Sequence, residues 1–451
     1  MDEQKEINLK QEPDEEIKKY DPYIARKKLI YSCFTFIGLV NNLGYVLIIS
    51  SAQQFASKLD DDRLIAFYPL ALIIFNSISR LINSKYCITV SYFKRALGLS
   101  LYFCFGYVFL FTVLTIVDNS KNFNQKLAFF LTLIPAVIMG TGQSFGEATF
   151  LGYIRTFPED YVSGWSSGTG FAGVVGASLS LLFKLINENF DLKNLYLIIS
   201  PIAILYFFAF YITYRIKQNI DAKIRLAVES DEKDEEDENM LDKQNLKSLP
   251  ERPSDLIPNN GKLASTDVSK NKNMSLENFP LAFIYGKRYI LNLFCVYYLE
   301  YTVCSGFSER ANFFERVDSG GMFFEKAQYE TFLLCYQIGV VISRSSLFIF
   351  KYLKFVELLN IIQTIDFIFW FFEAKIGITS NQWLCFITLL LLGICGGGVY
   401  VGCFYFILND NKIPPEYKEL CLNISTIFND TGVLLSSITC VILDHTFMRN
   451  K

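Results

Sequence analysis

The chain has 451 residues, of which 51% are hydrophobic, 16% aromatic and only 19% charged. Soluble domains carry about 25% charged residues, and a set of soluble domains would leave the many apolar stretches of bilayer length unexplained. The formal net charge of -3 gives no electrostatic reason to expect a nucleic-acid partner. Composition therefore predicts an all-α polytopic membrane protein in contact with a lipid bilayer.

The cysteines and the histidine argue against a metal centre. The 11 cysteines lie in or beside apolar segments and lack the spacing of a disulfide framework or a zinc site. The single histidine, His445, stands close to the end of the chain. We therefore expect no metal site and no cofactor.

In chain order, residues 1–28 are predicted to form a polar cytoplasmic tail, and about eleven transmembrane helices follow. The predicted spans cover residues 29–50, 64–84, 96–117, 127–155, 163–186, 194–215, 289–308, 330–350, 355–373, 383–408 and 419–443. They organise the chain into a six-helix bundle (29–216), an acidic disordered cytoplasmic linker (217–286), a five-helix bundle (287–445) and a short tail (446–451).

Lysine and arginine near the span ends predict the orientation, since cytoplasmic loops are enriched in both. Arg26, Lys27 and Lys28 precede the first span, and Lys287 and Arg288 precede the seventh. The intervening loops on the opposite side are less basic. We therefore expect a cytoplasmic N-terminus and, with an odd number of spans, a C-terminus on the luminal or outer side.

The linker contains the run DEKDEEDEN and few aromatic residues, a composition typical of disordered segments. The acidic run before Met240 and Leu241 faintly resembles a dileucine-type endosomal sorting signal. Two interpretations stay open, a solvated tether and a segment that binds sorting adaptors.

Weak internal similarity suggests that the two bundles are parallel pseudo-repeats. Residues 78–80 and 342–344 both read Ile-Ser-Arg, and residues 173–178 and 432–437 share a small-residue pattern. The offsets between matching positions are nearly constant, which chance does not readily give.

Small residues recur at helical spacing in the fifth and tenth spans, where they are predicted to let helix backbones approach closely. Such stripes would also allow helices to rock against one another. The glycines singled out for this packing are Gly168, Gly170, Gly173, Gly176, Gly397 and Gly398.

Several ionisable groups lie inside predicted spans, where each is costly unless it faces a cavity or a partner. One interpretation is an arginine–carboxylate lock between helices. The other is a site for a small-molecule substrate and protons, in which Arg344 binds an anionic group and carboxylates carry protons. The candidate residues for substrate binding or proton coupling are Glu147, Glu300, Tyr301, Arg344 and Asp430. Arg80 and Asp366 are also buried charges, but Asp366 lies in a span that we expect to be peripheral.

These motifs resemble the battenin family of lysosomal and vacuolar membrane proteins, named for Batten disease. The similar stretches include NNLGYVLIISSA, GEATFL, WSSGTGFAGVVGA, YYLEYTVCSGFSE, YQIGVVISRSSL and GGGVYVGCFY, in family order across most spans. The resemblance implies a major-facilitator-like fold and a place in the lysosomal or vacuolar membrane. It also implies efflux of glycerophosphodiesters and a part in vacuolar pH and basic amino-acid homeostasis.

Three alternatives remain beside this interpretation. An equilibrative nucleoside transporter has the same layout of eleven spans and a long linker, and a trafficking scaffold would move nothing. An enzyme is the least favoured, since the sequence has no HExxH, GxSxG or P-loop motif and no nucleophile paired with a histidine.

Overall fold

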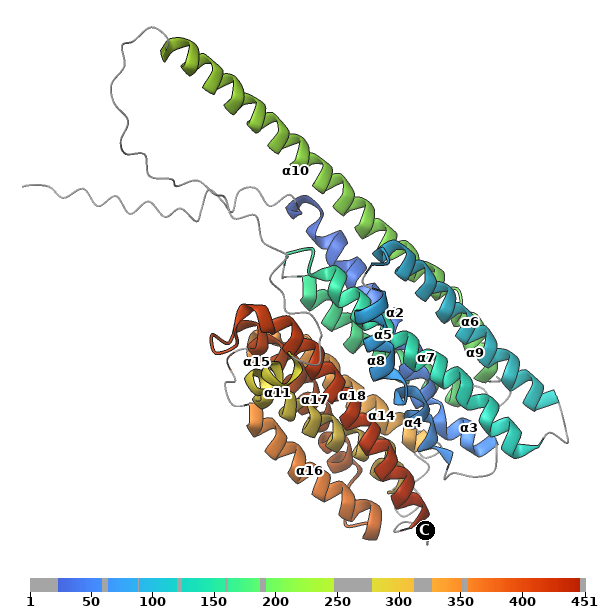
Figure 1. The fold of residues 1–451 in the computed structure, drawn as a ribbon. Helices are drawn as coiled ribbons and strands as arrows, with labels where there is room; N and C mark the ends of the chain where they lie inside the picture. Colours follow the sequence, from blue (N-terminus) through green and yellow to red (C-terminus); the bar gives the residue numbers. More distant parts are fainter. Residues whose placement is uncertain are drawn as a thin grey trace, which may run out of the picture.

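The computed structural model describes residues 23–58, 64–87, 89–119, 124–158, 161–186, 192–246, 278–311, 327–350, 352 and 356–446. Every regular element in these ranges is helical (Figure 1). The N-terminal half contains the helices α2 (Lys27–Ser50), α3 (Ala52–Lys58), α4 (Phe67–Ile73), α5 (Asn76–Tyr86), α6 (Tyr92–Asn119), α7 (Gln125–Ile154), α8 (Tyr161–Ile186), α9 (Leu192–Ile199) and α10 (Ile202–Leu246). The C-terminal half contains α11 (Phe279–Thr302), α12 (Ser308–Arg310), α14 (Gln328–Arg344), α15 (Leu347–Phe350), α16 (Val356–Ile376), α17 (Gln382–Asn409) and α18 (Pro415–His445).

The predicted membrane-spanning character is confirmed, because eight helical segments of the described chain are long and apolar enough to cross a bilayer. The three other predicted spans coincide with shorter or more polar helices. The second is divided into α4 and α5, the eighth is the 17-residue α14, and the ninth is α16, which contains four charged residues. The count of eleven is compatible with this arrangement and stays a prediction.

The start of the first long helix and the end of the last one lie on opposite sides of the bundle (Figure 1). The first long helix, α2, begins at the end from which α10 extends, and α18 finishes at the opposite end. We call these the α10 end and the far end. An odd number of crossings places the two termini in this way, as the eleven predicted spans require.

The sixth span continues well beyond its predicted limit, since α10 runs to Leu246. Residues 217–246 of the predicted disordered linker are thus helical, and residues 247–277 lie outside the described residues. Of its 30 residues, 18 are Glu, Lys, Leu, Ala, Gln, Arg or Met, which favour helix, and Lys217 pairs with Asp221 one turn later at 3.4 Å. The high charge content of residues 217–246 predicted disorder, whereas their helix propensity explains the observed extension of α10.

The packing of the helices repeats between the two halves. The α2 helix packs along α8, and its counterpart α11 packs along α18. Likewise α4 and α5 pack on α7, and their counterpart α14 packs on α17. The halves meet through α14 against α8 and through α18 against α4 and α5. The second and eighth spans therefore face the opposite half, which brings both Ile-Ser-Arg motifs to the interface.

The glycines singled out from the sequence lie where helices approach closely. A methyl group at Gly168 would lie 3.0 Å from the Leu39 backbone nitrogen, and one at Gly176 would lie 2.8 Å from Val46, both on α2. Gly173 faces Gln337 of α14, and Gly398 faces the Phe350 ring. The small residues thus border both the α2–α8 contact and the interface between halves.

Gly170 and Gly397 lie beside the side chain of Arg344. A methyl group at Gly397 would lie 3.3 Å from Arg344 Cγ, and one at Gly170 would lie 3.6 Å from Arg344 Cβ. The contact is tight at Gly397 and of ordinary van der Waals length at Gly170, and the two glycines belong to opposite halves of the protein.

Candidate functional site

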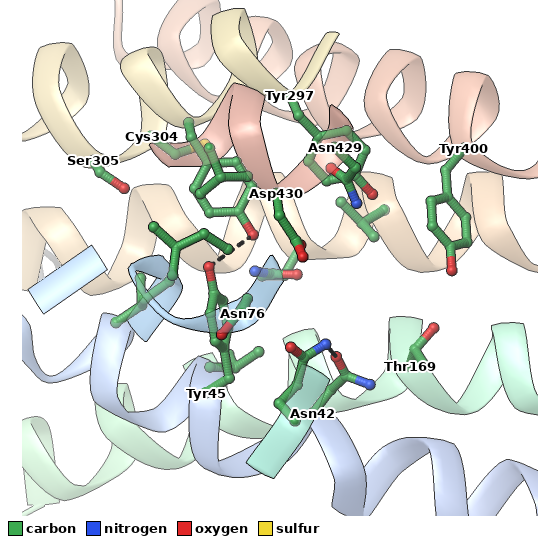
Figure 2. Close-up of a pocket in the computed structure, with 18 of the residues that line it drawn as sticks. Asn42, Tyr45, Asn76, Thr169, Tyr297, Cys304, Ser305, Tyr400, Asn429 and Asp430 are labelled. Carbon is green, nitrogen blue, oxygen red and sulfur yellow. Dashed lines mark hydrogen bonds between the residues drawn. The ribbon is translucent and has the colours of Figure 1, made fainter. Parts of the chain in front are cut away.

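A cavity of about 90 Å³ lies between the two halves, where the buried charges of both meet. Figure 2 shows Asn42 and Thr169 of the N-terminal half across from Tyr400 and Asp430 of the C-terminal half. This volume holds a few water molecules. A metabolite would therefore need the two halves to move apart, because ligand sites usually measure about 300 Å³ or more.

One side of the cavity carries a buried cluster of three charges. The Arg80 guanidinium on α5 pairs with Glu147 on α7 and with Asp430 on α18, each at 2.7 Å. Glu147 also accepts hydrogen bonds from Tyr400 at 3.2 Å and from Gln143 at 3.4 Å. All three charged side chains are at least nine-tenths buried. Since Arg80 and Glu147 belong to one half and Asp430 to the other, this cluster joins the halves.

Arg344 lies at the C-terminal end of α14 and lines the same cavity. Its guanidinium donates to the Thr169 hydroxyl at 3.0 Å and to the Tyr297 hydroxyl at 3.1 Å. Its Cζ lies 4.5 Å from the centroid of the Tyr400 ring, a cation–π arrangement. No carboxylate of the described chain forms an ion pair with Arg344, and its Nε has no hydrogen-bond partner there.

The two arginines occupy matching places in the repeats, yet their surroundings differ. Arg80 contacts Glu147 on α7, whereas Arg344 contacts Tyr400 at the matching place on α17, 253 residues further on. From the opposite half, Asp430 contributes a carboxylate to Arg80, whereas the described residues contribute the Thr169 hydroxyl to Arg344 and no carboxylate. Arg80 is thus neutralised within the protein, while Arg344 presents a cation to the cavity.

Glu300 lies behind the cavity wall rather than on it. The Tyr336 hydroxyl donates to Glu300 Oε1, and Tyr336 itself lines the cavity. Glu300 Oε2 has no hydrogen-bond partner among the described residues. The neighbouring Tyr301 lines the cavity and stacks on Tyr297, and the hydroxyl of Tyr45 donates to that of Tyr301 at 3.4 Å.

Of the candidate residues, four line the cavity, namely Glu147, Tyr301, Arg344 and Asp430. The structure separates Glu300 from them by the Tyr336 side chain, and it places Asp366 on α16, buried and away from the cavity lining.

The sequence did not identify the tyrosines around Arg344, Thr169, or the pairing of Arg80 with two carboxylates. The glycine-rich runs of the fourth and tenth spans, which begin at Gly140 and Gly393, were the available signal. Their offset of 253 residues would have matched Glu147 with Tyr400 and shown that the surroundings of the arginines differ.

The chemistry available here is the recognition of a small polar molecule. The cavity offers a guanidinium, several tyrosine hydroxyls and the amides of Asn42 and Gln143. Within the part of the chain that the structure describes, no group of three or more metal-ligating side chains comes together.

The fold and the cavity define a multi-pass, all-helical membrane protein with a major-facilitator-like architecture. A bacterial homologue of the human lysosomal transporter Spinster, solved in an inward-facing and unoccupied conformation, is similar with a TM-score of 0.54 and 11% identity. The comparison covers 95% of this chain and 84% of that one. A D-xylose-proton symporter gives a TM-score of 0.55 at 11% identity, over 93% and 91% of the two chains.

Sequence comparison then gives the family. The model of the CLN3 protein family matches residues 32–450, and this chain belongs to that family. Battenin of Dictyostelium discoideum is 26% identical over 418 residues, which cover 93% of this chain and 94% of battenin. Protein BTN1 of Saccharomyces cerevisiae is 27% identical over 444 residues, covering 94% and 96%. The resemblance to the battenin family expected from the sequence is confirmed.

Proposed function

We propose that this protein is a secondary transporter of small anionic or zwitterionic metabolites, which bind in the cavity between its halves. The observation that carries the proposal is the contrast between the two arginines of the repeats. Arg80 is paired with two carboxylates, whereas Arg344 faces the cavity with hydroxyl and aromatic contacts and with no ion pair among the described residues. A buried cation kept without a carboxylate is costly, and an anionic substrate would offset that cost.

Glycerophosphodiesters are the substrate class that we favour. A guanidinium binds phosphate oxygens through two parallel hydrogen bonds, and the amides and hydroxyls around the cavity suit a polyol. Basic amino acids are less favoured, because Glu147 and Asp430, which would hold a cationic group, are already engaged by Arg80. Nucleosides lack the anionic group that Arg344 would recognise.

Alternating access is the mechanism that this arrangement supports. Ion pairs join the halves at both ends: Lys184 with Glu330 at the far end, at 2.9 Å, and Arg155 with Glu419 at the α10 end, at 2.5 Å. Glu330 is fully buried, whereas both members of the α10-end pair are more than a third exposed. Breaking the pairs in turn would open the cavity to each side of the membrane.

The family resemblance favours the lysosomal or vacuolar membrane as the site of this transport, with a cytoplasmic N-terminus and a contribution to vacuolar pH homeostasis. The binding of sorting adaptors by the linker remains a separate hypothesis. A trafficking scaffold that transports nothing is the competing function, and it predicts that the cavity residues are dispensable.

The test is counterflow of labelled solutes in proteoliposomes that contain the wild type, Arg344→Gln, or Arg288→Gln as the control. Arg288 is a half-exposed arginine paired with Glu357, so its loss should leave transport unchanged. We expect glycerophosphodiester counterflow that Arg344→Gln weakens about 10- to 100-fold in affinity, since charged hydrogen bonds contribute about 1.5–3 kcal/mol. Equal counterflow by Arg344→Gln and wild type would contradict the proposed site. Counterflow of arginine or a nucleoside instead would reassign the substrate, and no counterflow of any solute would favour the scaffold.

A further inference from the structure

The α16 helix turns a polar face toward the protein and an apolar face outward. Gln363, Asp366 and Glu373 are buried at helical spacing along one face. Ile361 and Ile365, on the opposite face, are 58% and 64% exposed, as lipid-facing residues are. Buried carboxyl groups in a span are expensive and mark functional sites by default.

Asp366 is the least satisfied of these groups. It is 5% exposed, it forms no ion pair, and its Oδ2 has no hydrogen-bond partner in the described ranges. Gln363, one turn earlier, donates to the Val296 carbonyl on α11 at 3.4 Å. Phe367, next to Asp366, packs against Phe307 with ring centroids 5.2 Å apart. These contacts fix the Asp366 side of α16 against α11 and the π-helical turn η5 (Val303–Phe307) that follows it.

Glu300 is a second incompletely satisfied carboxyl on the adjoining helix. It is 2% exposed, and its Oε2 is unpartnered while Oε1 accepts from Tyr336. Its carboxylate packs against Gly396 of α17, where an added methyl group would lie 2.6 Å from the carboxyl carbon and the carboxylate would have to shift. The thiols of Cys304 and Cys395 each lie within electrostatic reach of both Glu300 and Asp366. The two carboxyls therefore belong to one buried region.

The charged and titratable groups around this region come from every helix packed on α16 or on Glu300. They are Cys304 on η5, Cys395 on α17, Tyr336 and Arg344 on α14, Tyr297 and Tyr301 on α11, Tyr45 on α2, Cys440 on α18, and the Glu309–Arg310 pair on α12. Arg344 lies within electrostatic reach of Glu300, while none of the cations of the described residues forms an ion pair with Asp366. Apart from the Glu309–Arg310 pair, the region thus has two carboxyls, and the cation within reach of Glu300 belongs to the cavity.

We propose that Asp366 and Glu300 form a proton-binding site inside the C-terminal half, behind the cavity wall, and that the protein moves a proton together with its anionic substrate. The site rests on the proposed transport function. Ionised Glu300 attracts Arg344, and a proton bound at Glu300 removes that attraction. Arg344 is then available to the substrate anion, so proton and anion bind together.

The route of the proton follows from the same helices. Glu373 lies near the far end of α16, where its Oε2 accepts from the Thr379 backbone N–H at 2.9 Å in the segment that follows the helix. Asp366 lies seven residues, about 10 Å, deeper along the helix. Tyr336 then connects Glu300 to the cavity. Since about 10 Å is far longer than a hydrogen bond, water molecules would carry the proton between these carboxyls, and at each step the O–H bond to the donor breaks as the O–H bond to the acceptor forms.

The experiment measures accumulation and counterflow of glycerophosphodiester in the same proteoliposomes, with the membrane potential clamped. A gradient of about one pH unit drives one-to-one cotransport to an accumulation of about tenfold. We expect wild type to accumulate the solute on the alkaline side, and Asp366→Asn to retain counterflow with an accumulation ratio of about one. The matched control is Glu357→Gln, a half-exposed carboxyl on the same helix that pairs with Arg288, and it should accumulate as wild type does.

The possible results distinguish a failure of the proposed proton site from a failure of the proposed transport function. Tenfold accumulation by Asp366→Asn would overturn the proton site. Counterflow by the wild type without accumulation would also overturn it, but the proposed transport function would then still hold. Absence of wild-type counterflow would remove the transport function itself. If Asp366→Asn does not fold, Asp366→Glu keeps the titratable group and should accumulate the solute. Its infrared band for a protonated carboxyl should differ from that of wild type, and an unchanged band would exclude Asp366 as the proton carrier.

Discussion

Replacing Arg80 should unfold this protein far more readily than replacing Arg344, although the two arginines hold matching places in the repeats. The perturbation is a double-mutant cycle with Arg80→Gln, Asp430→Asn and the two combined. Arg344→Gln serves as the matched control. The reasoning under test is that Arg80 is a structural lock between the halves, whereas Arg344 is held for a ligand.

The expected magnitudes follow from burial and partners. Arg80 is 5% exposed and makes two ion pairs of 2.7 Å, and removing one member of a buried pair costs about 3–5 kcal/mol. Arg80→Gln leaves Glu147 and Asp430 buried without a cation, so we expect the top of that range. Asp430→Asn retains the bond to Glu147 and should cost less. Arg344→Gln breaks hydrogen bonds but no ion pair, so about 1.5–3 kcal/mol is expected.

The assay is denaturant unfolding in detergent micelles, followed by tryptophan emission, which reports on the buried Trp165 and Trp370. The double variant should be more stable than the sum of the single costs predicts, with a coupling of about 1–3 kcal/mol. Costs that add within about 0.5 kcal/mol would show that the Arg80–Asp430 contact contributes little. An Arg344→Gln variant as unstable as Arg80→Gln would refute the distinction between the two arginines.

Two further predictions concern the ends of the bundle and its glycines. Glu330→Gln should lower the free energy of unfolding by about 1–3 kcal/mol, because the Glu330 carboxylate that pairs with Lys184 is fully buried. Arg155→Gln breaks an exposed ion pair and should lower it by less than about 1 kcal/mol. Similar losses for the two variants would show that burial does not distinguish the ion pairs at the two ends. Gly168→Ala should lower the free energy of unfolding by about 1–3 kcal/mol, because the added methyl group overpacks against α2. The control is Gly98→Ala, where a methyl group would meet nothing within 4 Å, and it should be neutral or stabilising. Equal effects of the two substitutions in thermal unfolding would refute close packing as the role of Gly168.

Much of the architecture could be predicted from the sequence because bilayer physics leaves few choices. Apolar stretches of span length must become helices, and small-residue stripes indicate where helices approach. The extension of α10 to Leu246 was missed because charge content and helix propensity point in opposite directions there. Composition reports only that such a segment is solvated, whereas its helix-forming residues determine its local structure.

The site was only partly predictable. The position of a charged residue inside an apolar segment predicts that the residue is buried, but it does not predict which residue forms an ion pair with it. The residues expected at one site were Glu147, Glu300, Tyr301, Arg344 and Asp430. All of them line the cavity except Glu300, which lies behind Tyr336. The sequence predicted that an arginine could pair with these carboxylates but not which arginine. In the structure, Arg80 rather than Arg344 forms the ion pairs. Which cation is neutralised depends on contacts between residues 350 positions apart, and no local pattern in the chain encodes them.

The difference between the two arginines explains how a duplicated bundle can bind an asymmetric solute. In a symmetric pair of repeats, both arginines would be neutralised or both would face the cavity, and the site would present equal charges to both ends of a ligand. Here Tyr400 stands at the place of Glu147, and the Thr169 hydroxyl contacts Arg344 where the Asp430 carboxylate contacts Arg80. One repeat thereby closes its charges into a lock, while the other leaves a guanidinium facing tyrosines and amides. A molecule with an anionic group at one end and hydroxyl groups at the other fits that division, and a molecule with a cation at both ends does not.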